Sequence, residues 1–435
     1  MNKRGFFTGF IKSKILLLLA LFVTVLYLSN DFSIIDIRQT ALIAAIGIDK
    51  ADDLYEVSVQ IAIPQATDQT ASNNSAVLTG YGKTVGDAIE HISTSTGWYT
   101  KLSFCNLIVL GSSLFDEDIM KPLDYFLRTD KIQDTARMCM AEKSAKEILS
   151  AKTPLDELSA FSVTKILEPD SESLSSIAAT SLKEFAIGYY SESGFSSIPI
   201  VKLTEAEGES EGGNNATSSS DDYALETVKA DTIKDRDEIK RLSEGGGEGD
   251  DSGDGGMSKN KSSNIFDATS TALLNKGVKK LVLERDETLV FNMLTHPISE
   301  AFIEVPNAEY EGKTATVFLS VNNIKKSIKL RFTGATPVLK LSLTTDVRLD
   351  DTDIISEPKE LVKNYIVPDK VLEKLSEFFK EKIENVFEKT RAESIDVFQV
   401  KNRLYRTQNA YFENMKNTVL QNTKLSVTVK TKSYR

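Results

Sequence analysis

The chain has 435 residues, with 52 Lys and Arg against 63 Asp and Glu, and a formal net charge of −11. A single hydrophobic core seldom grows beyond about 250–300 residues, so this length predicts more than one core. The acidic balance and the absence of a long basic stripe argue against a nucleic-acid partner, which needs clustered cations for phosphate contacts. Only Cys105 and Cys139 are present, which is too few for a disulfide framework and favours buried thiols over a bridge.

The amino terminus has the pattern of an export signal. Lys3, Arg4, Lys12 and Lys14 precede an apolar run, Ile15–Leu28. The run is shorter than the ~20 residues of a typical spanning helix, so a cleaved signal peptide and an anchor both fit its length. No paired small residues follow it, which favours an uncleaved membrane anchor within residues 1–33, with the later residues on the extracytoplasmic side. The anchor residues are Ile15, Leu16, Leu17, Leu18, Leu19, Leu21, Phe22, Val23, Val25, Leu26 and Leu28.

A β-hairpin is predicted next. Apolar residues stand at every second position of Tyr55–Ile63, which is the period of a half-buried strand. The preceding segment, Leu42–Ile48, is almost wholly apolar. Asp-rich residues 49–53 join the two, and this composition is typical of a turn. Two antiparallel strands near the start of a domain are therefore expected.

The remainder of the first domain, residues 34–203, alternates helix and strand patterns, which indicates α/β or α+β layering. The predicted helices are Thr84–Ser95, Ile119–Leu127, Ala145–Ser150, Leu155–Leu167 and Ser173–Gly188. The predicted strands are Ser103–Leu110, Thr135–Ala141 and the apolar run Ile198–Leu203.

Residues 204–263 change abruptly to Glu, Asp, Gly, Ser and Asn, as in the run Gly245–Gly256. Such a composition cannot bury enough apolar surface to offset the entropy of ordering, and it predicts a linker or disordered insert. The second domain, residues 264–435, is expected to contain a meandering sheet and a long helix, Asp369–Ala392, followed by a second helix through Met415. The predicted strands are Ser270–Leu274, Lys280–Leu283, Thr314–Val321, Ser327–Thr333, Pro337–Leu349 and Leu425–Lys430, with a helix at Asp286–Leu294. The expected class is α+β, with two to three mixed domains and antiparallel or mixed sheets.

Several stretches resemble the C subunits of spore germinant receptors, the GerA-type nutrient receptors. The hairpin carries the fit at Asp36, Arg38, Gly47, Ile48, Asp49, Lys50, Tyr55, Val57, Val59, Gln60 and Ile61. A second stretch fits at Arg128, Asp130, Ala145, Lys146, Ile148 and Leu149, and a third at Asp396, Val397, Phe398, Leu404 and Tyr405. The lipid-bearing Cys and the Trp of the family fall on Ile34 and Ile35, and its usual Gly after Phe398 is Gln399.

The resemblance implies a non-enzymatic subunit without a cofactor. Its expected partners are the integral-membrane A and B subunits of the receptor, and its expected location is the outer side of the inner spore membrane. The residues that the resemblance singles out as motif or interface candidates are Asp36, Arg38, Gly47, Asp49, Gln60, Arg128 and Asp130.

Catalytic and metal chemistry find little support in the residues. His91 and His296 fall on different predicted domains, too few for a His-based nucleophile system or metal site. The Gly-rich run lacks a following Lys-Ser/Thr, so a phosphate-binding loop is not expected. Two alternatives stay open: an exported solute-binding or envelope scaffold protein, and a cell-wall hydrolase using acids such as Asp52–Asp53 or Asp350–Asp351–Asp353. The hydrolase requires two carboxyl groups within about 5–10 Å of each other in a cleft.

Overall fold

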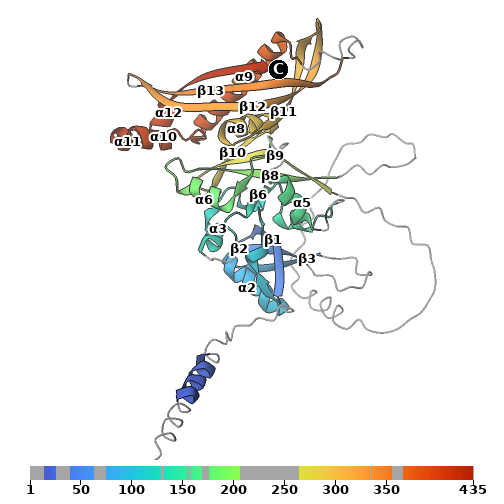
Figure 1. The fold of residues 1–435 in the computed structure, drawn as a ribbon, viewed down its shortest axis with the longest axis vertical. Helices are drawn as coiled ribbons and strands as arrows, with labels where there is room; N and C mark the ends of the chain where they lie inside the picture. Colours follow the sequence, from blue (N-terminus) through green and yellow to red (C-terminus); the bar gives the residue numbers. More distant parts are fainter. Residues whose placement is uncertain are drawn as a thin grey trace, which may run out of the picture. The chain divides into compact units, whose positions relative to one another are not determined.

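The computed structural model describes residues 14–25, 40–62, 75–128, 132–153, 156, 158–168, 176–205, 264–334, 336–354 and 366–434. They form a mixed α+β fold with two sheets (Figure 1). The strands are β1 (Thr40–Ala51), β2 (Leu54–Ala62), β3 (Ser75–Gly82), β4 (Tyr99–Lys101), β5 (Leu107–Leu110), β6 (Arg137–Ala141), β7 (Thr180–Ser181), β8 (Phe195–Glu205), β9 (Asn264–Asn275), β10 (Val278–Leu283), β11 (Glu300–Tyr310), β12 (Lys313–Thr333), β13 (Thr336–Thr352) and β14 (Lys424–Ser433). The helices after residue 40 are α2 (Val85–Thr96), α3 (Met120–Arg128), α4 (Ala145–Ser150), α5 (Ser159–Ile166), α6 (Leu182–Tyr190), α8 (Arg285–Thr295), α9 (Asp369–Ala392), α10 (Val400–Thr407), α11 (Asn409–Met415) and α12 (Val419–Asn422).

The first sheet is built around the predicted hairpin. β1 pairs antiparallel with β2, with Ile46 opposite Val59, which confirms the hairpin. The strand order is β10-β9-β8-β6-β5-β1-β2-β3, and β1, β5, β6 and β8 run parallel to one another. Because helices cover both faces of the central strands, β1 and β5 are almost continuously buried, as their apolar runs require.

Two glycines let α2 lie against β3. Thr84 caps the helix by accepting a hydrogen bond from the Asp87 amide, and the buried stripe of α2 includes Ala88 and Ile92. A Cβ at Gly80 would lie 2.3 Å from the Ala88 carbonyl oxygen, and a Cβ at Gly82 would lie 2.4 Å from the Ala88 nitrogen. Only a residue without a side chain permits this distance between helix and strand.

Strands from both sides of the acidic segment meet in the first sheet. β8 ends at Glu205, β9 begins at Asn264, and the two are neighbours in the strand order. The acidic segment itself, residues 206–263, lies outside the described residues. Hence β9 and β10, which the sequence analysis assigns to the second domain, are hydrogen-bonded strands of the first sheet. The boundary between the two domains stays a prediction.

The second sheet has the order β11-β12-β13-β14. The first three strands form an antiparallel meander, and β14 runs parallel to β13, so the sheet is mixed. The long helix α9 packs on one face with Leu375, Phe379 and Ile383, which confirms its predicted apolar stripe. Helix α9 and the sheet together enclose the larger apolar core.

Two details of the second sheet differ from expectation. The predicted strands Thr314–Val321 and Ser327–Thr333 are one continuous strand, β12, with a register shift between Asn322 and Lys325. Asn323 adopts a φ of 50° at this bulge. The alternation of inward and outward side chains is interrupted there, although the strand stays in the sheet. Strand β11 was not predicted at all, because Pro306 and Asn307 interrupt its pattern.

The described part of the predicted anchor, residues 14–25, is helical. Its large apolar side chains are 55% to 69% exposed, whereas Leu26 and Leu28 lie outside the described residues. Within the described ranges, no helix has both the length and the apolar character required to cross a membrane.

Candidate functional site

Asp49, at the end of the predicted hairpin arm, holds helix α4. Its carboxylate accepts hydrogen bonds from the Ala145 amide (3.1 Å), the Lys146 amide (3.2 Å) and the Ser144 hydroxyl (3.0 Å). Burial raises the pKa of Asp49, and the donated hydrogen bonds of α4 oppose this shift. A Cβ at Gly47 would lie 3.0 Å from the Ala145 Cβ, so the Gly at this position brings α4 close to β1. The Gly-Ile-Asp motif therefore docks a helix on the sheet.

Gln60 acts similarly from β2. Its amide nitrogen donates to the Leu149 carbonyl (2.8 Å) and to the Ser159 hydroxyl (3.1 Å), and its amide oxygen accepts from the Ala160 nitrogen (3.0 Å). The side chain is 2% exposed. Gln60 thus joins the end of α4 to the start of α5 on one face of the sheet. Gly47, Asp49 and Gln60 lie together, and their contacts are internal.

Of the four other motif candidates, the structure describes only Arg128, which lies outside this group. Arg128 is exposed at the end of α3 and forms an ion pair with Asp124. Asp36, Arg38 and Asp130 lie outside the described residues. The role of these four residues at an interface remains a prediction.

Asp396 makes a second buried cap, at the start of α10. Its carboxylate accepts from the amides of Val400 (2.6 Å) and Lys401 (2.8 Å), and the side chain is 1% exposed. Burial raises the pKa of Asp396. The intervening residue, Gln399, has φ 54° and ψ 43°, in the left-handed region. Glycine is the residue that adopts this backbone conformation without strain, which explains the Gly of the pattern at this position.

Substituting Gln399 with glycine is expected to stabilise the protein by about 0.5–1 kcal/mol, because the left-handed backbone no longer carries a Cβ. The same substitution at Gln408, an exposed residue with φ −142°, is the matched control. At Gln408 glycine only increases the conformational entropy of the unfolded chain, so the free energy of unfolding should fall by about 0.5–1 kcal/mol. Thermal unfolding followed by circular dichroism measures both changes, and a Gln399→Gly variant less stable than the parent would contradict the strain.

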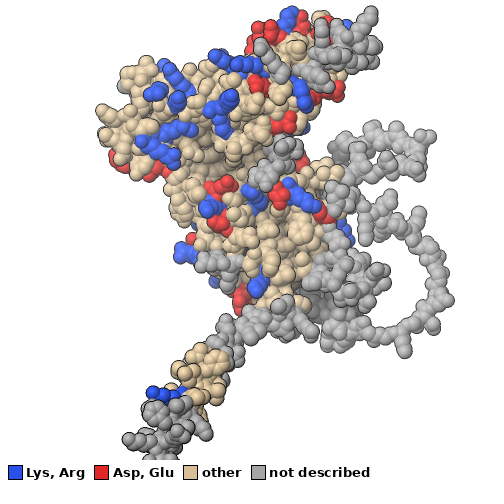
Figure 2. Space-filling model, in the orientation of Figure 1, with Lys and Arg blue, Asp and Glu red and all other residues tan. Residues whose placement is uncertain are grey.

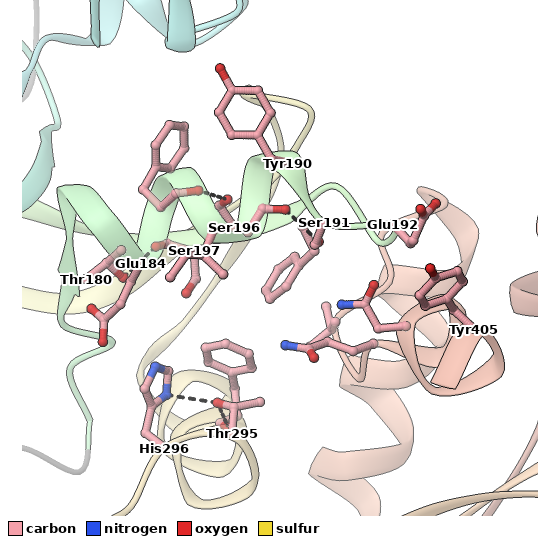
Figure 3. Close-up of a pocket in the computed structure, with 18 of the residues that line it drawn as sticks. Thr180, Glu184, Tyr190, Ser191, Glu192, Ser196, Ser197, Thr295, His296 and Tyr405 are labelled. Carbon is pink, nitrogen blue, oxygen red and sulfur yellow. Dashed lines mark hydrogen bonds between the residues drawn. The ribbon is translucent and has the colours of Figure 1, made fainter. Parts of the chain in front are cut away.

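A pocket of about 480 Å³ lies beside this cap, between α6, the start of β8, the end of α8 and α10 (Figure 3). Its walls combine aromatic rings, hydroxyl groups and a few charged groups. The aromatic residues are Phe185, Tyr190, Phe195, Phe291 and Tyr405; the hydroxyl residues are Thr180, Ser191, Ser196, Ser197 and Thr295; the ionisable residues are Glu184, Glu192, His296 and Arg406. Such a lining suits a group with an apolar body and polar ends.

Most of the hydroxyl groups serve the pocket wall itself. Ser196 donates to the Phe185 carbonyl (3.2 Å), Thr180 donates to the Ser197 carbonyl (2.6 Å), and Ser191 donates to the Gly188 carbonyl (2.7 Å). Thr295 donates to the Phe291 carbonyl (2.7 Å), and its hydroxyl oxygen also lies 2.9 Å from His296 Nδ1. A base that activates a nucleophile must accept the hydroxyl proton, and here the Phe291 carbonyl competes for that proton.

No sequence motif predicts this pocket. Its walls come from three segments about a hundred residues apart, and the sequence analysis singles out His296, Val397, Gln399 and Tyr405 without predicting that they meet. His296 is partly buried, and its carbonyl accepts a hydrogen bond from Lys326. Burial lowers the pKa of His296, because the charged imidazolium is poorly solvated there.

His296 makes stability depend on pH. The unfolded chain takes up the proton near the ordinary pKa of 6.5, and the folded chain takes it up only at lower pH. His296 therefore leaves the free energy of unfolding unchanged above pH 6.5. Below that pH it decreases the free energy of unfolding, progressively down to the lowered pKa. In urea titrations at a series of pH values, His296→Asn should abolish this part of the acid-side loss. Equal pH slopes for parent and variant would show that His296 titrates alike in both states.

Neither cysteine is bridged: Cys105 and Cys139 are both free and buried. Burial raises the pKa of the Cys105 thiol to about 12, so it stays protonated at neutral pH. Among the described residues, no three His, Cys, Asp or Glu side chains are grouped so that they could hold a metal ion. The acids Asp52 and Asp53 are exposed at the hairpin turn.

Two family matches cover most of the chain. Residues 33–203 match the spore germination protein N-terminal domain, and residues 269–435 match the spore germination B3/GerAC-like C-terminal domain. The chain belongs to the germinant-receptor C-subunit family. The first match ends before the acidic segment and the second begins after it.

One solved structure is similar to the chain, the crystal structure of the GerBC protein. The two share 13% identity over 90% of this chain and 97% of that one, with a TM-score of 0.48. No curated protein matches the chain.

Proposed function

We propose that the chain is a non-catalytic C subunit that acts with integral-membrane A and B subunits of a nutrient germinant receptor. The observation that carries the proposal is the pair of family matches, residues 33–203 and 269–435, which together leave out little besides the amino terminus and the acidic segment. The internal roles of Asp49 and Gln60 support it, because the motif residues build the scaffold and do not form a reaction centre.

We further propose that the amino-terminal segment tethers the protein to the inner spore membrane, with the folded part on its outer side. The basic residues before Ile15 and the exposed apolar side chains of helix 14–25 support this location. Apolar side chains that lack protein partners gain free energy when lipid surrounds them.

Deleting the gene tests the receptor role. Spores without it, and without a paralogue, should fail to respond to the nutrient, and the full chain expressed in trans should restore the response. A trigger that bypasses nutrient receptors is the control, and it should act equally on both spores. An unchanged nutrient response in the deletion strain would refute the proposal.

Affinity purification of the tagged chain from spore membranes distinguishes the remaining alternative. A receptor subunit should co-purify with multi-span membrane proteins encoded beside it. An exported solute-binding or envelope scaffold protein should be recovered without them.

A further inference from the structure

The second sheet has one face that is strongly basic. Its other face packs on α9 and the core through residues such as Leu339, Leu341 and Leu343. The basic face, as we name it here, carries seven exposed cations on adjacent strands, and Figure 2 shows Lys and Arg gathered over this part of the molecule. They are Lys325, Lys329 and Arg331 of β12, Lys340 of β13, and Lys424, Lys430 and Lys432 of β14. No ion pair joins any of them to another described residue.

Strand register places like charges against each other on the basic face. Lys329 lies directly opposite Lys340 in the antiparallel β12–β13 pair. Arg331 is opposite Val338, and Lys424 lies beside Val338 on the other side. Like charges that face each other across strands destabilise a sheet, so the Lys329–Lys340 pair lowers the stability of the fold. Such an unfavourable pairing is expected where the residues serve a function.

The cations are close enough for their potentials to add. Neighbouring strands lie about 4.8 Å apart and alternate residues of one strand about 6.8 Å apart. These spacings separate Lys329 from Lys340 and from Arg331, and both are below the Debye length of about 8 Å at physiological ionic strength. The face is therefore a local positive field on a protein whose net charge is −11.

Acidic residues border the face at one end. Asp346 lies beside Lys432 and accepts a hydrogen bond from Asn323. Glu373 and Glu377 of α9 line a groove together with Lys430 and Lys432. The uncompensated charge is therefore concentrated at Lys325, Lys329, Arg331, Lys340 and Lys424.

The composition of the face favours a lipid surface over a protein partner. The residues between the cations are mainly small and hydroxylated, including Ser327, Ser342, Ser426 and Thr428. Centres of protein interfaces are depleted in Lys and enriched in aromatic residues. Lysine clusters of this kind instead bind the headgroups of anionic lipids. We propose that the basic face docks on anionic phospholipid headgroups, a second membrane contact separate from the amino-terminal segment. The proposal rests on the proposed function only for the presence of a membrane near this face.

Vesicle co-sedimentation of the full chain tests the docking. Vesicles of phosphatidylcholine alone report binding through the apolar amino terminus, and vesicles that also contain phosphatidylglycerol report the added contribution of charge. A K329Q/R331Q/K340Q variant should lose roughly 100-fold of that added affinity, since each cation near an anionic surface contributes about fivefold. The control variant K121Q/K374Q/K380Q removes three exposed lysines elsewhere and should retain most of it.

Amine labelling of the bound full chain locates the contact. Lys329 and Lys340 should be protected on phosphatidylglycerol vesicles and not on phosphatidylcholine vesicles, and the protection should vanish in about 1 M salt, where the Debye length is about 3 Å. Equal binding to both vesicles, equal losses in the two triple variants, or protection by soluble polyglutamate but not by vesicles would overturn the lipid assignment. These assays contain no receptor subunits, so their failure leaves the proposed receptor role untouched, and a failed gene deletion test leaves the lipid result untouched.

Discussion

Replacement of Asp49 by alanine should destabilise the folded protein by about 2–4 kcal/mol, because the amides at the start of α4 lose their buried acceptor. The Ala145 amide, bonded to Asp49 at 3.1 Å, is left without that partner, whereas the Lys146 amide keeps the Ser144 hydroxyl at 3.2 Å. Hydrogen exchange should therefore show early opening of α4. Urea unfolding gives the total loss of stability.

The same measurement on Asp53→Ala provides a matched control. Asp53 is an exposed carboxylate in the hairpin turn, so its loss should change stability by less than about 0.5 kcal/mol. Asp49→Asn should fall between the two, since an amide oxygen can still accept one of the hydrogen bonds. If Asp49→Ala were as stable as Asp53→Ala, Asp49 would not hold α4 as the structure indicates.

The second large effect is expected at Gly80. Alanine there would place its Cβ 2.3 Å from the Ala88 carbonyl oxygen and 2.6 Å from the Ile92 side chain. A backbone oxygen cannot move without the whole of α2, so a loss of about 2–4 kcal/mol is expected. Thermal unfolding and the exchange rates of the α2 amides measure it.

Gly312→Ala separates crowding from backbone strain. Gly312 lies in the β11–β12 turn with φ +72° and no heavy atom within 4 Å of its added Cβ. Its substitution should cost only about 1 kcal/mol, from the left-handed conformation alone. Equal losses at the two glycines would mean that α2 and β3 are not packed so closely.

Secondary structure could be predicted from the sequence where the residues of one element show a clear periodicity or cap. The hairpin follows from an apolar run, an Asp-rich turn and an alternating strand, and α4 begins at Ala145 and ends at Ser150 as its sequence predicts. Alternation does not predict the continuous strand β12 with its bulge at Asn323, or strand β11 with its proline. In both cases hydrogen bonds to a neighbouring strand maintain a strand whose own pattern is interrupted.

Sites assembled from distant segments could not be derived in this way. Asp49 and Gln60 were singled out by resemblance, but their roles depend on α4 and α5, about a hundred residues further on. The pocket beside His296 unites residues from Thr180 to Arg406, and the basic face depends on a register that no single strand reveals. Periodicity reports which face of an element is buried, not which element covers it.

The adjacency of β8 and β9 has a consequence for cleavage of the chain. A protease cut between residues 206 and 263 would leave two fragments that still share the first sheet, since β9 and β10 belong to the later fragment. Such a nicked protein should migrate as one particle under native conditions and as two bands after denaturation. The halves could accordingly be produced separately and reassembled, as in a split reporter.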